Sequence, residues 1–545
     1  MINLEKSLTG RRILVIDDLV EARSSLKKMV AILGADNIDA ATDDVEAMSL
    51  IQEHEYDIVL SDYNLGRSKD GQQILEEAHF SQRLQATSLF VVISGENTIE
   101  MIMGALECAP DGYITKPCTL NVLKERLIRI ITIKEGLHQV NKAIDQQEYD
   151  LAITYCLEIL KNDKRLRLPA SRILGQLLIR QKKYQQALNI YSKLLNERSV
   201  FWAKLGQALC VFKLGDANSA LSLLNNTLVE HPLYVQCYDL IAEILLTEDK
   251  PLEAQEALEK AILISPKATL RQMELGRVAF DNGDMEAAKP AFKYSIRLGR
   301  DSCHKSVKNY LQFALSTQLL LNNPTARQTR NKANEAFRAL GELKQHFSSD
   351  QESLFEASII ECKIHFTMQN IEEANHSASI AKVLLASLAN PNINYKLQMA
   401  ETFVEIEDSV EAQEIIDSLK SSKLSDEQTT MLNQLDNDLN CQKLKRQTIH
   451  FNDEGIDHYK RGDLEKAITV FDQATNNNQA GISVLLNSIQ VNIAIMERDS
   501  PDKKRLDHVR SLLIRIGEVT KDDERFSRYT QLRKTYKRLC RASAA

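Results

Sequence analysis

Four short apolar runs near the N-terminus each end in polar or charged side chains, and this feature constrains the fold more than any other. The runs and their endings are Ile13–Ile16 before Asp17 and Asp18, Asp57–Ser61 before Asp62, Phe90–Ile93 before Ser94, and Asp111–Thr115 before Lys116. Runs of this length and composition predict the strands of an open parallel sheet. Binding sites in such sheets form beside the carboxyl ends of the strands. We therefore expect three carboxylates, one hydroxyl and one ammonium group to lie together at one sheet edge.

This combination of groups suits a phosphoryl-transfer site that depends on a divalent metal. A carboxylate can attack a phosphoryl group only when the negative charge on both partners is offset, and Mg²⁺ held by carboxylates does this. Asp17, Asp18 and Asp62 can hold the metal, and Asp62 can also be the nucleophile that becomes an aspartyl phosphate. Lys116 offers a positive charge to the phosphoryl oxygens, and the Ser94 hydroxyl can donate a hydrogen bond to them.

The same motifs, in this order, make residues 11–130 resemble the receiver domain of two-component response regulators. The resemblance implies an α/β fold with a doubly wound, five-stranded parallel sheet. It also implies a role for each motif residue: Asp62 as phospho-acceptor, Asp17 and Asp18 as metal-binding acids, Lys116 as active-site lysine, Ser94 as switch hydroxyl and Tyr113 as switch aromatic. A histidine kinase or phosphotransfer protein is the implied donor, and Mg²⁺ (or Mn²⁺) the implied cofactor.

Four further positions take their meaning from the same resemblance. The backbone carbonyl of Asn64 would bind the metal, and Asn64 and Glu96 occupy the positions that set the lifetime of the phosphate. Their pairing resembles that of chemotaxis receivers, which implies a phosphate that is lost fairly quickly. Pro117 would follow a cis peptide bond. Cys118 departs from the aromatic residue that commonly follows Lys-Pro, which affects helix packing rather than chemistry.

Each motif residue also has an ordinary structural interpretation. A single aspartate after a strand is more often a loop or cap residue, and Asp17 or Asp18 could cap a helix that begins near Leu19. Tyr113 could simply be half-buried on a strand. The joint occurrence of all the motifs in the right order favours a phosphorylation site over a structural relic.

Composition limits the remaining possibilities. A chain of 545 residues predicts three or four domain-sized units. It contains no run of 18 or more apolar residues, which predicts no membrane span, and Met1–Gly10 lacks a signal-peptide core. Nine cysteines without a Cys-x-x-Cys pair favour a reducing cytoplasm and disfavour a zinc site. A net charge of −7 implies no general attraction to nucleic acid.

Beyond residue 130 the pattern is helical, and small residues recur every 34 positions. The recurring positions form three series, which are Ala208, Ala242 and Gly276, then Ala220, Ala254 and Ala288, then Pro232 and Pro266. Small residues are needed where paired helices come closest, and proline suits the turn that ends a helix. This frame resembles the tetratricopeptide repeat, and residues 451–474 resemble a further copy. Residues 302–351 fit poorly and predict two long helices broken near Asn322.

The repeats predict an all-α solenoid of seven or eight helical hairpins in residues 131–480, after a receiver domain in residues 1–130. A concave groove in such a solenoid binds an extended peptide or a helix. Residues 481–545 are expected to form a helical cap. Within it, residues 501–545 carry 13 Lys or Arg and 6 Asp or Glu, so their net charge is 13 − 6 = +7. A nearly continuous helix from Leu120 to Val140, with Gly136 as the only break, should join receiver and repeats.

These expectations together indicate a cytoplasmic, bacterial phosphorelay response regulator whose repeats bind an unidentified protein or peptide. Phosphorylation of Asp62 would change the face made by the strand at 111–115 and the helices on either side. This change would alter dimerisation or access to the groove. No separate catalytic domain is expected. Two alternatives remain open: a regulator that contacts nucleic acid through the basic C-terminal region, and a receiver used unphosphorylated as a constitutive docking domain.

Overall fold

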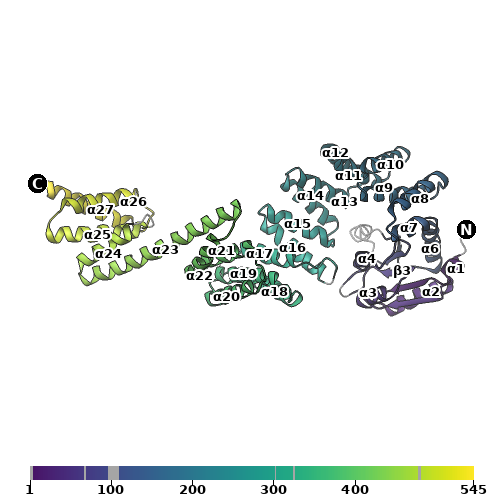
Figure 1. The fold of residues 1–545 in the computed structure, drawn as a ribbon, viewed down its shortest axis with the longest axis horizontal. Coiled ribbons are helices and arrows are strands. Elements are labelled where there is room, and N and C mark those ends of the chain that lie inside the picture. Colours follow the sequence, from purple (N-terminus) through teal and green to yellow (C-terminus); the bar gives the residue numbers. More distant parts are fainter. Residues whose placement is uncertain are drawn as a thin grey trace. The chain divides into compact units, whose positions relative to one another are not determined.

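The computed structural model describes the chain apart from residues 1–3, 67–68, 96–109, 301, 323–325, 477–479 and 545. The chain divides into two compact units. One comprises Met1–Asn322 with Ala326–Leu343, and the other comprises Asn323–Thr325 with Lys344–Ala545. An α/β domain begins the first unit, and in the described residues after it the regular elements are all helices (Figure 1).

The α/β domain is built on five parallel strands in the order β2-β1-β3-β4-β5. The strands are β1 (Arg12–Ile16), β2 (Asn37–Ala41), β3 (Ile58–Asp62), β4 (Leu89–Ser94) and β5 (Gly112–Thr115). The helices around them are α1 (Leu4–Leu8), α2 (Val20–Ile32), α3 (Asp44–Glu53), α4 (Gly71–Phe80) and α6 (Leu120–Gly136). The predicted doubly wound receiver fold is therefore confirmed.

Both faces of the sheet are covered, because the strands are apolar on both sides. Ile13 and Val15 of β1 belong to one core cluster with α1, α2 and α6, whereas Leu14 and Ile16 belong to another with α3 and α4. Each of these four side chains is fully buried, and burial of such a side chain stabilises the fold by about 1.5–3 kcal/mol. Strands buried on both faces leave only their ends free for polar groups, which places the candidate site at the carboxyl edge.

The helices after the receiver form hairpins in both units. The first unit contains α7 (His138–Asp145), α8 (Tyr149–Asn162), α9 (Arg167–Arg180), α10 (Tyr184–Glu197), α11 (Phe201–Lys213), α12 (Ala217–Glu230), α13 (Val235–Thr247), α14 (Pro251–Ile264), α15 (Thr269–Asp281), α16 (Met285–Gly299) and α17 (Val307–Leu319). Helix α18 (Arg327–His346) begins in the first unit, and its last residues, from Lys344 on, belong to the second. The second contains α19 (Gln351–Thr367), α20 (Ile371–Ser387), α21 (Ile393–Glu405), α22 (Ser409–Lys420), α23 (Asp426–Arg461), α24 (Leu464–Thr475), α25 (Ile482–Asp499), α26 (Lys503–Ile516) and α27 (Phe526–Ala544).

Consecutive helices pack as pairs from α7–α8 to α15–α16, and again from α19–α20 to α23–α24. These are eight hairpins among the described residues, which confirms the expected number. The break in residues 302–351 is also confirmed, because α17 ends at Leu319 and α18 begins at Arg327. The second of these helices is long, with 20 residues, but the first has only 13.

The 34-residue series of small residues forms the seams between paired helices. Ala208, Ala220, Ala254 and Ala288 are fully buried, and Ala242 is 2% exposed. Gly276 shows why small residues are required, since a Cβ there would lie 2.7 Å from the ring of Phe292 in the paired helix. The close approach of backbone and ring is what the sequence pattern indicated.

The receiver is joined to the repeats almost without interruption. Helix α6 ends at Gly136, α7 begins at His138, and the amide of Leu137 donates to the carbonyl of Ile133. A Cβ on Gly136 would lie 2.4 Å from a methyl carbon of Leu166, so the segment just before α9 packs closely on the junction. The predicted nearly continuous helical connection is confirmed. No helix in the described part of the chain is long and apolar enough to span a bilayer.

Candidate functional site

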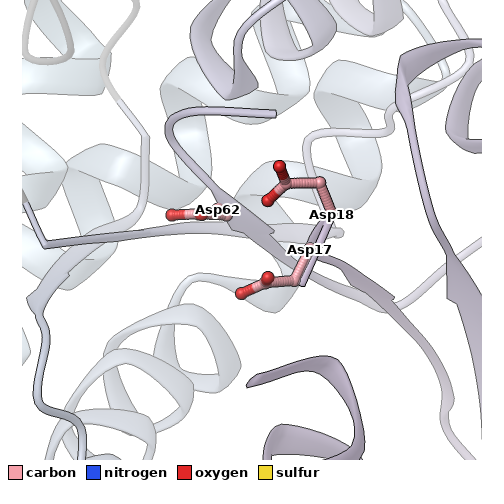
Figure 2. Close-up of side chains that lie close together, drawn as sticks. All are labelled: Asp17, Asp18 and Asp62. Atoms are coloured by element: carbon pink, nitrogen blue, oxygen red, sulfur yellow. The ribbon is translucent and has the colours of Figure 1, made fainter. Parts of the chain in front are cut away.

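Three carboxylates converge at the carboxyl edge of the sheet. Asp17 and Asp18 follow β1, and Asp62 is the last residue of the neighbouring β3 (Figure 2). One oxygen from each carboxylate lies within 4.8 Å of an oxygen of the other two. Asp17 is fully buried, Asp62 is 6% exposed, and Asp18 faces solvent. Oxygen atoms at this spacing can bind one Mg²⁺ ion, which prefers carboxylates and retains several waters.

The ammonium group of Lys116 lies between two of these carboxylates. Its Nζ is 2.9 Å from Oδ2 of Asp17 and 3.0 Å from Oδ2 of Asp62. The peptide bond between Lys116 and Pro117 is cis. The amide of Lys116 donates to the carbonyl of Ser94 at 2.7 Å, so the lysine backbone is fixed against the end of β4. A single cation therefore offsets part of the negative charge of both acids.

Burial and neighbouring charge shift the ionisation of this pair. Burial raises the pKa of Asp62 above its ordinary value, and the nearby carboxylate of Asp17 adds to the rise, although Lys116 and the amide of Tyr63 oppose it. Burial lowers the pKa of Lys116, but its hydrogen bonds to the two carboxylates outweigh this and raise it overall. Asp62 is thus a desolvated carboxylate held beside a stable cation, which is a suitable state for a nucleophile.

Two glycines shape the backbone around the carboxylates. A Cβ on Gly71, the first residue of α4, would lie 2.3 Å from the carbonyl oxygen of Asp62. Gly66 has a φ of +75°, and a Cβ there would lie 2.9 Å from a carboxylate oxygen of Asp18. The amide of Tyr63 donates to Oδ1 of Asp62 at 2.8 Å. Gly66 and Gly71 were not identified from the sequence as part of the site. The available signal was the presence of glycines shortly after the strand that ends in Asp62.

The remaining motif residues take up varied positions. Ser94 ends β4, is 1% exposed, and pairs in register with Thr115 of β5. Tyr113 lies on β5, half-buried against the core cluster of α3 and α4. Asn64 is exposed, two residues beyond Asp62, and its side-chain oxygen accepts from the amide of Gly66 at 3.3 Å.

Glu96, a candidate for control of phosphate lifetime, lies outside the described residues. So does the helix expected before β5, which was to form part of the face that changes on phosphorylation.

The cap interpretation of the acidic pair is wrong. Helix α2 begins at Val20 with Leu19 as its N-cap, and no side chain caps it. Oδ1 of Asp17 accepts instead from the amide of Leu19, which is not part of the helix. Arg23, which the sequence analysis did not single out, donates to the Asp17 carbonyl at 2.6 Å and fixes the start of α2 against the strand end.

Comparison with known proteins agrees with this architecture. Residues 13–128 match the family model of the response regulator receiver domain, and residues 235–267 match that of the tetratricopeptide repeat. Chemotaxis protein CheY-3 of Vibrio cholerae is 29% identical over 119 residues, an alignment that covers 22% of this chain and 90% of the relative. The chain therefore has an N-terminal receiver domain and at least one recognised repeat.

Two solved structures are similar to parts of this chain. A CheY-like receiver domain from Methanospirillum hungatei JF-1 is 24% identical with a TM-score of 0.22, covering 23% of this chain and 98% of its own. A MamA fragment from Desulfovibrio magneticus RS-1 is 21% identical with a TM-score of 0.27, covering 31% of this chain and 97% of its own.

Proposed function

We propose that this protein is a phosphorelay response regulator in which Asp62 accepts a phosphoryl group and the repeats bind protein partners. The observation that carries this proposal is the placement of Lys116 between Asp17 and Asp62, at the edge where Asp18 completes an acidic cluster. An acceptor carboxylate, a cation for the phosphoryl oxygens and a metal-binding acid pair are the groups that transfer to an aspartate requires.

The proposed transfer is a displacement at phosphorus. A carboxylate oxygen of Asp62 attacks the phosphorus of a phosphohistidine on a kinase or phosphotransfer protein, an O–P bond forms, and the N–P bond breaks. The released imidazole nitrogen takes a proton from solvent. The buried oxygen Oδ1 is fixed by the amide of Tyr63, whereas Oδ2 faces Lys116. Lys116 can follow the incoming phosphoryl oxygens because its flexible stem carries a point charge.

The acidic cluster fits a divalent cation. Asp17, Asp18 and Asp62 would hold Mg²⁺ (or Mn²⁺), with the carbonyl of Asn64 as a further ligand. When bound, the cation supplies positive charge to the transferred phosphoryl group. Hydrolysis of the aspartyl phosphate by water then returns the carboxylate, and we propose that Asn64 and Glu96 set its rate. No separate enzymatic activity is proposed.

Helical hairpins support the second half of the proposal. Stacked hairpins of this kind leave a concave surface that binds peptides or helices. The basic C-terminal helix gives less support to a nucleic-acid contact, because Arg538 pairs with Glu497 and Arg528 donates to Asn487 and Gln490.

The eight cysteines in the described part of the chain are free, which supports a reducing compartment such as the bacterial cytoplasm.

Phosphorylation by a small acyl phosphate tests the proposal. The full chain is incubated with radiolabelled acetyl phosphate and Mg²⁺, and acid-stable, base-labile label is counted. Label is expected on the wild type and on Glu55→Gln, which changes an exposed acid, but not on Asp62→Asn. Equal labelling of Asp62→Asn, or equal labelling of the wild type with and without Mg²⁺, would overturn the proposed reaction.

A further inference from the structure

Within the first unit, hydrogen bonds and ion pairs of the described residues join the repeats to the receiver near the start of the repeats and again much later in the chain. Near the start of the repeats, the carboxylate of Asp145 in α7 accepts from the amide and the hydroxyl of Thr87, at 3.1 and 2.9 Å, and from the amide of Ala86. Much later in the chain, residues around α15 and α16 contact α4, the helix that follows the acceptor strand. The receiver is therefore held by two parts of the repeats that lie more than 100 residues apart.

A glutamine links the start of α4 to a repeat backbone. The side chain of Gln73 donates to the carbonyl of Leu298, at the end of α16, at 3.1 Å. The side-chain oxygen of Gln73 also accepts from the backbone amide of Asp70, and the backbone amide of Gln73 donates to Oδ1 of Asp70. This reciprocal pair is a capping box, which fixes where the helix starts. The residue that caps the start of α4 is therefore also the residue that contacts Leu298.

A repeat lysine stands beside the acceptor strand. Nζ of Lys267, in the turn between α14 and α15, lies 3.9 Å from Oδ2 of Asp70 and 5.5 Å from the centre of the Tyr63 ring. Tyr63 directly follows Asp62 and donates its amide to the acceptor carboxylate. The lysine side chain is 53% exposed, so the ion pair by itself is weak and responds readily to added charge.

The start of α4 is also in contact with the acceptor itself. The amide of Gly71 donates to the carbonyl of Tyr63 at 2.8 Å, and the space for a Cβ on Gly71 is filled by the carbonyl of Asp62. Farther along the helix, Nε2 of His304 lies 3.9 Å from a carboxylate oxygen of Glu76. The acceptor strand, the helix cap and the repeat surface form one continuous set of contacts.

We infer that helix α4, through Lys267 and the Gln73–Leu298 hydrogen bond, carries the signal from Asp62 to the repeats. This route rests on the proposed phosphorylation of Asp62, and it differs from the face around β5 that the sequence suggested. Negative charge added at Asp62 attracts Lys267 and stabilises the contact, so the phosphorylated receiver holds the repeats more firmly. By thermodynamic reciprocity, the contact in turn stabilises the phosphoryl group on Asp62.

Binding of beryllofluoride, which mimics a phosphoryl group on aspartate, measures this coupling. The full chain with Mg²⁺ is titrated and the bound fluoride signal is followed by ¹⁹F NMR. Lys267→Ala and Gln73→Ala should each weaken apparent binding by about fivefold. Lys260→Ala, which removes an exposed lysine from the preceding helix, should bind as the wild type does. Hydrogen exchange of α4 should slow on binding in the wild type and change less in Lys267→Ala.

The outcomes separate this inference from the proposed function. If the wild type does not bind beryllofluoride, or Asp62→Asn binds it equally, the proposed function fails. If the wild type binds beryllofluoride and all three alanine variants bind it with wild-type affinity, the proposed function stands and only the α4 route is wrong. Faster exchange in α4 on binding would also contradict it, because the contact would then open rather than tighten.

Discussion

Nζ of Lys116 lies 3.0 Å from Oδ2 of Asp62, and the same nitrogen lies 2.9 Å from Asp17. One cation is therefore shared by two carboxylates that are almost completely buried, while the third acid of the cluster, Asp18, faces solvent. This arrangement leaves a net negative charge at the edge of the sheet. A divalent cation can offset that charge. Binding or removal of the cation should therefore change the free energy of unfolding as well as the rate of phosphorylation.

Replacement of Lys116 by alanine should destabilise the receiver in metal-free buffer. Two buried carboxylates would lose their shared partner, and because the Lys116 side chain is itself 26% exposed, we expect a loss of about 2 kcal/mol rather than the larger cost of a fully buried pair. Urea unfolding followed by circular dichroism measures it. Addition of Mg²⁺ should restore part of the loss, and an unchanged unfolding midpoint in metal-free buffer would contradict the role assigned to Lys116.

Asp18→Asn should separate metal binding from folding. Asp18 is exposed, so the free energy of unfolding should change by less than about 0.5 kcal/mol. Removal of one of three carboxylates should nevertheless weaken Mg²⁺ binding by about tenfold or more. Isothermal titration calorimetry with Mg²⁺ provides the comparison, and Glu55→Gln is the matched control. Wild-type affinity in Asp18→Asn would remove this residue from the metal site.

The glycine seams of the repeats can be tested with two alanine substitutions of opposite expected sign. Gly276→Ala places a Cβ 2.7 Å from the Phe292 ring, and such overpacking costs about 1–3 kcal/mol. Gly341→Ala, inside α18, meets nothing within 4 Å and should stabilise its helix by about 0.5–1 kcal/mol. Thermal unfolding of the full chain should show these shifts. Equal effects of the two substitutions would argue against a close seam at Gly276.

Thiol labelling should distinguish the packed repeat interior from its surface. Cys156, Cys237 and Cys362 are fully buried. Burial also raises their pKa to about 12, so these thiols are neutral at pH 8 as well as inaccessible. Cys441 is exposed and should react with iodoacetamide first. Mass spectrometry of tryptic peptides gives the order of labelling, and modification of Cys362 as fast as Cys441 in the folded chain would contradict the packing.

The strand ends could be predicted because each strand of the receiver sheet is determined by residues that are adjacent in the sequence. Each strand is a short apolar run, and the polar residue that ends it must lie at the carboxyl edge, so Asp17, Asp62 and Lys116 were placed correctly from pattern alone. The 34-residue series likewise follows from the close approach of paired helices. Gly66 and Gly71 were missed because the need for a small residue arises from atoms that come together only in the fold.

Two other features depend on contacts that no local pattern contains. The hydrogen bond from Gln73 to Leu298 joins residues 225 positions apart and uses a backbone acceptor, which leaves no trace in composition. Helix α23 runs from Asp426 to Arg461, whereas the sequence showed only the repeat copy that begins near residue 451. Neither proline nor glycine interrupts residues 426–454, and that continuity was the available signal for one long helix.

Whether Asp62 is the phospho-acceptor is tested most directly by identifying the phosphorylated residue. The wild-type chain is treated with acetyl phosphate and Mg²⁺, then with borohydride, which reduces an aspartyl phosphate to homoserine, and the peptides are sequenced by mass spectrometry. We expect homoserine at position 62 and at no other aspartate. Unmodified Asp62 in a folded, Mg²⁺-loaded protein, or homoserine at another position, would contradict it.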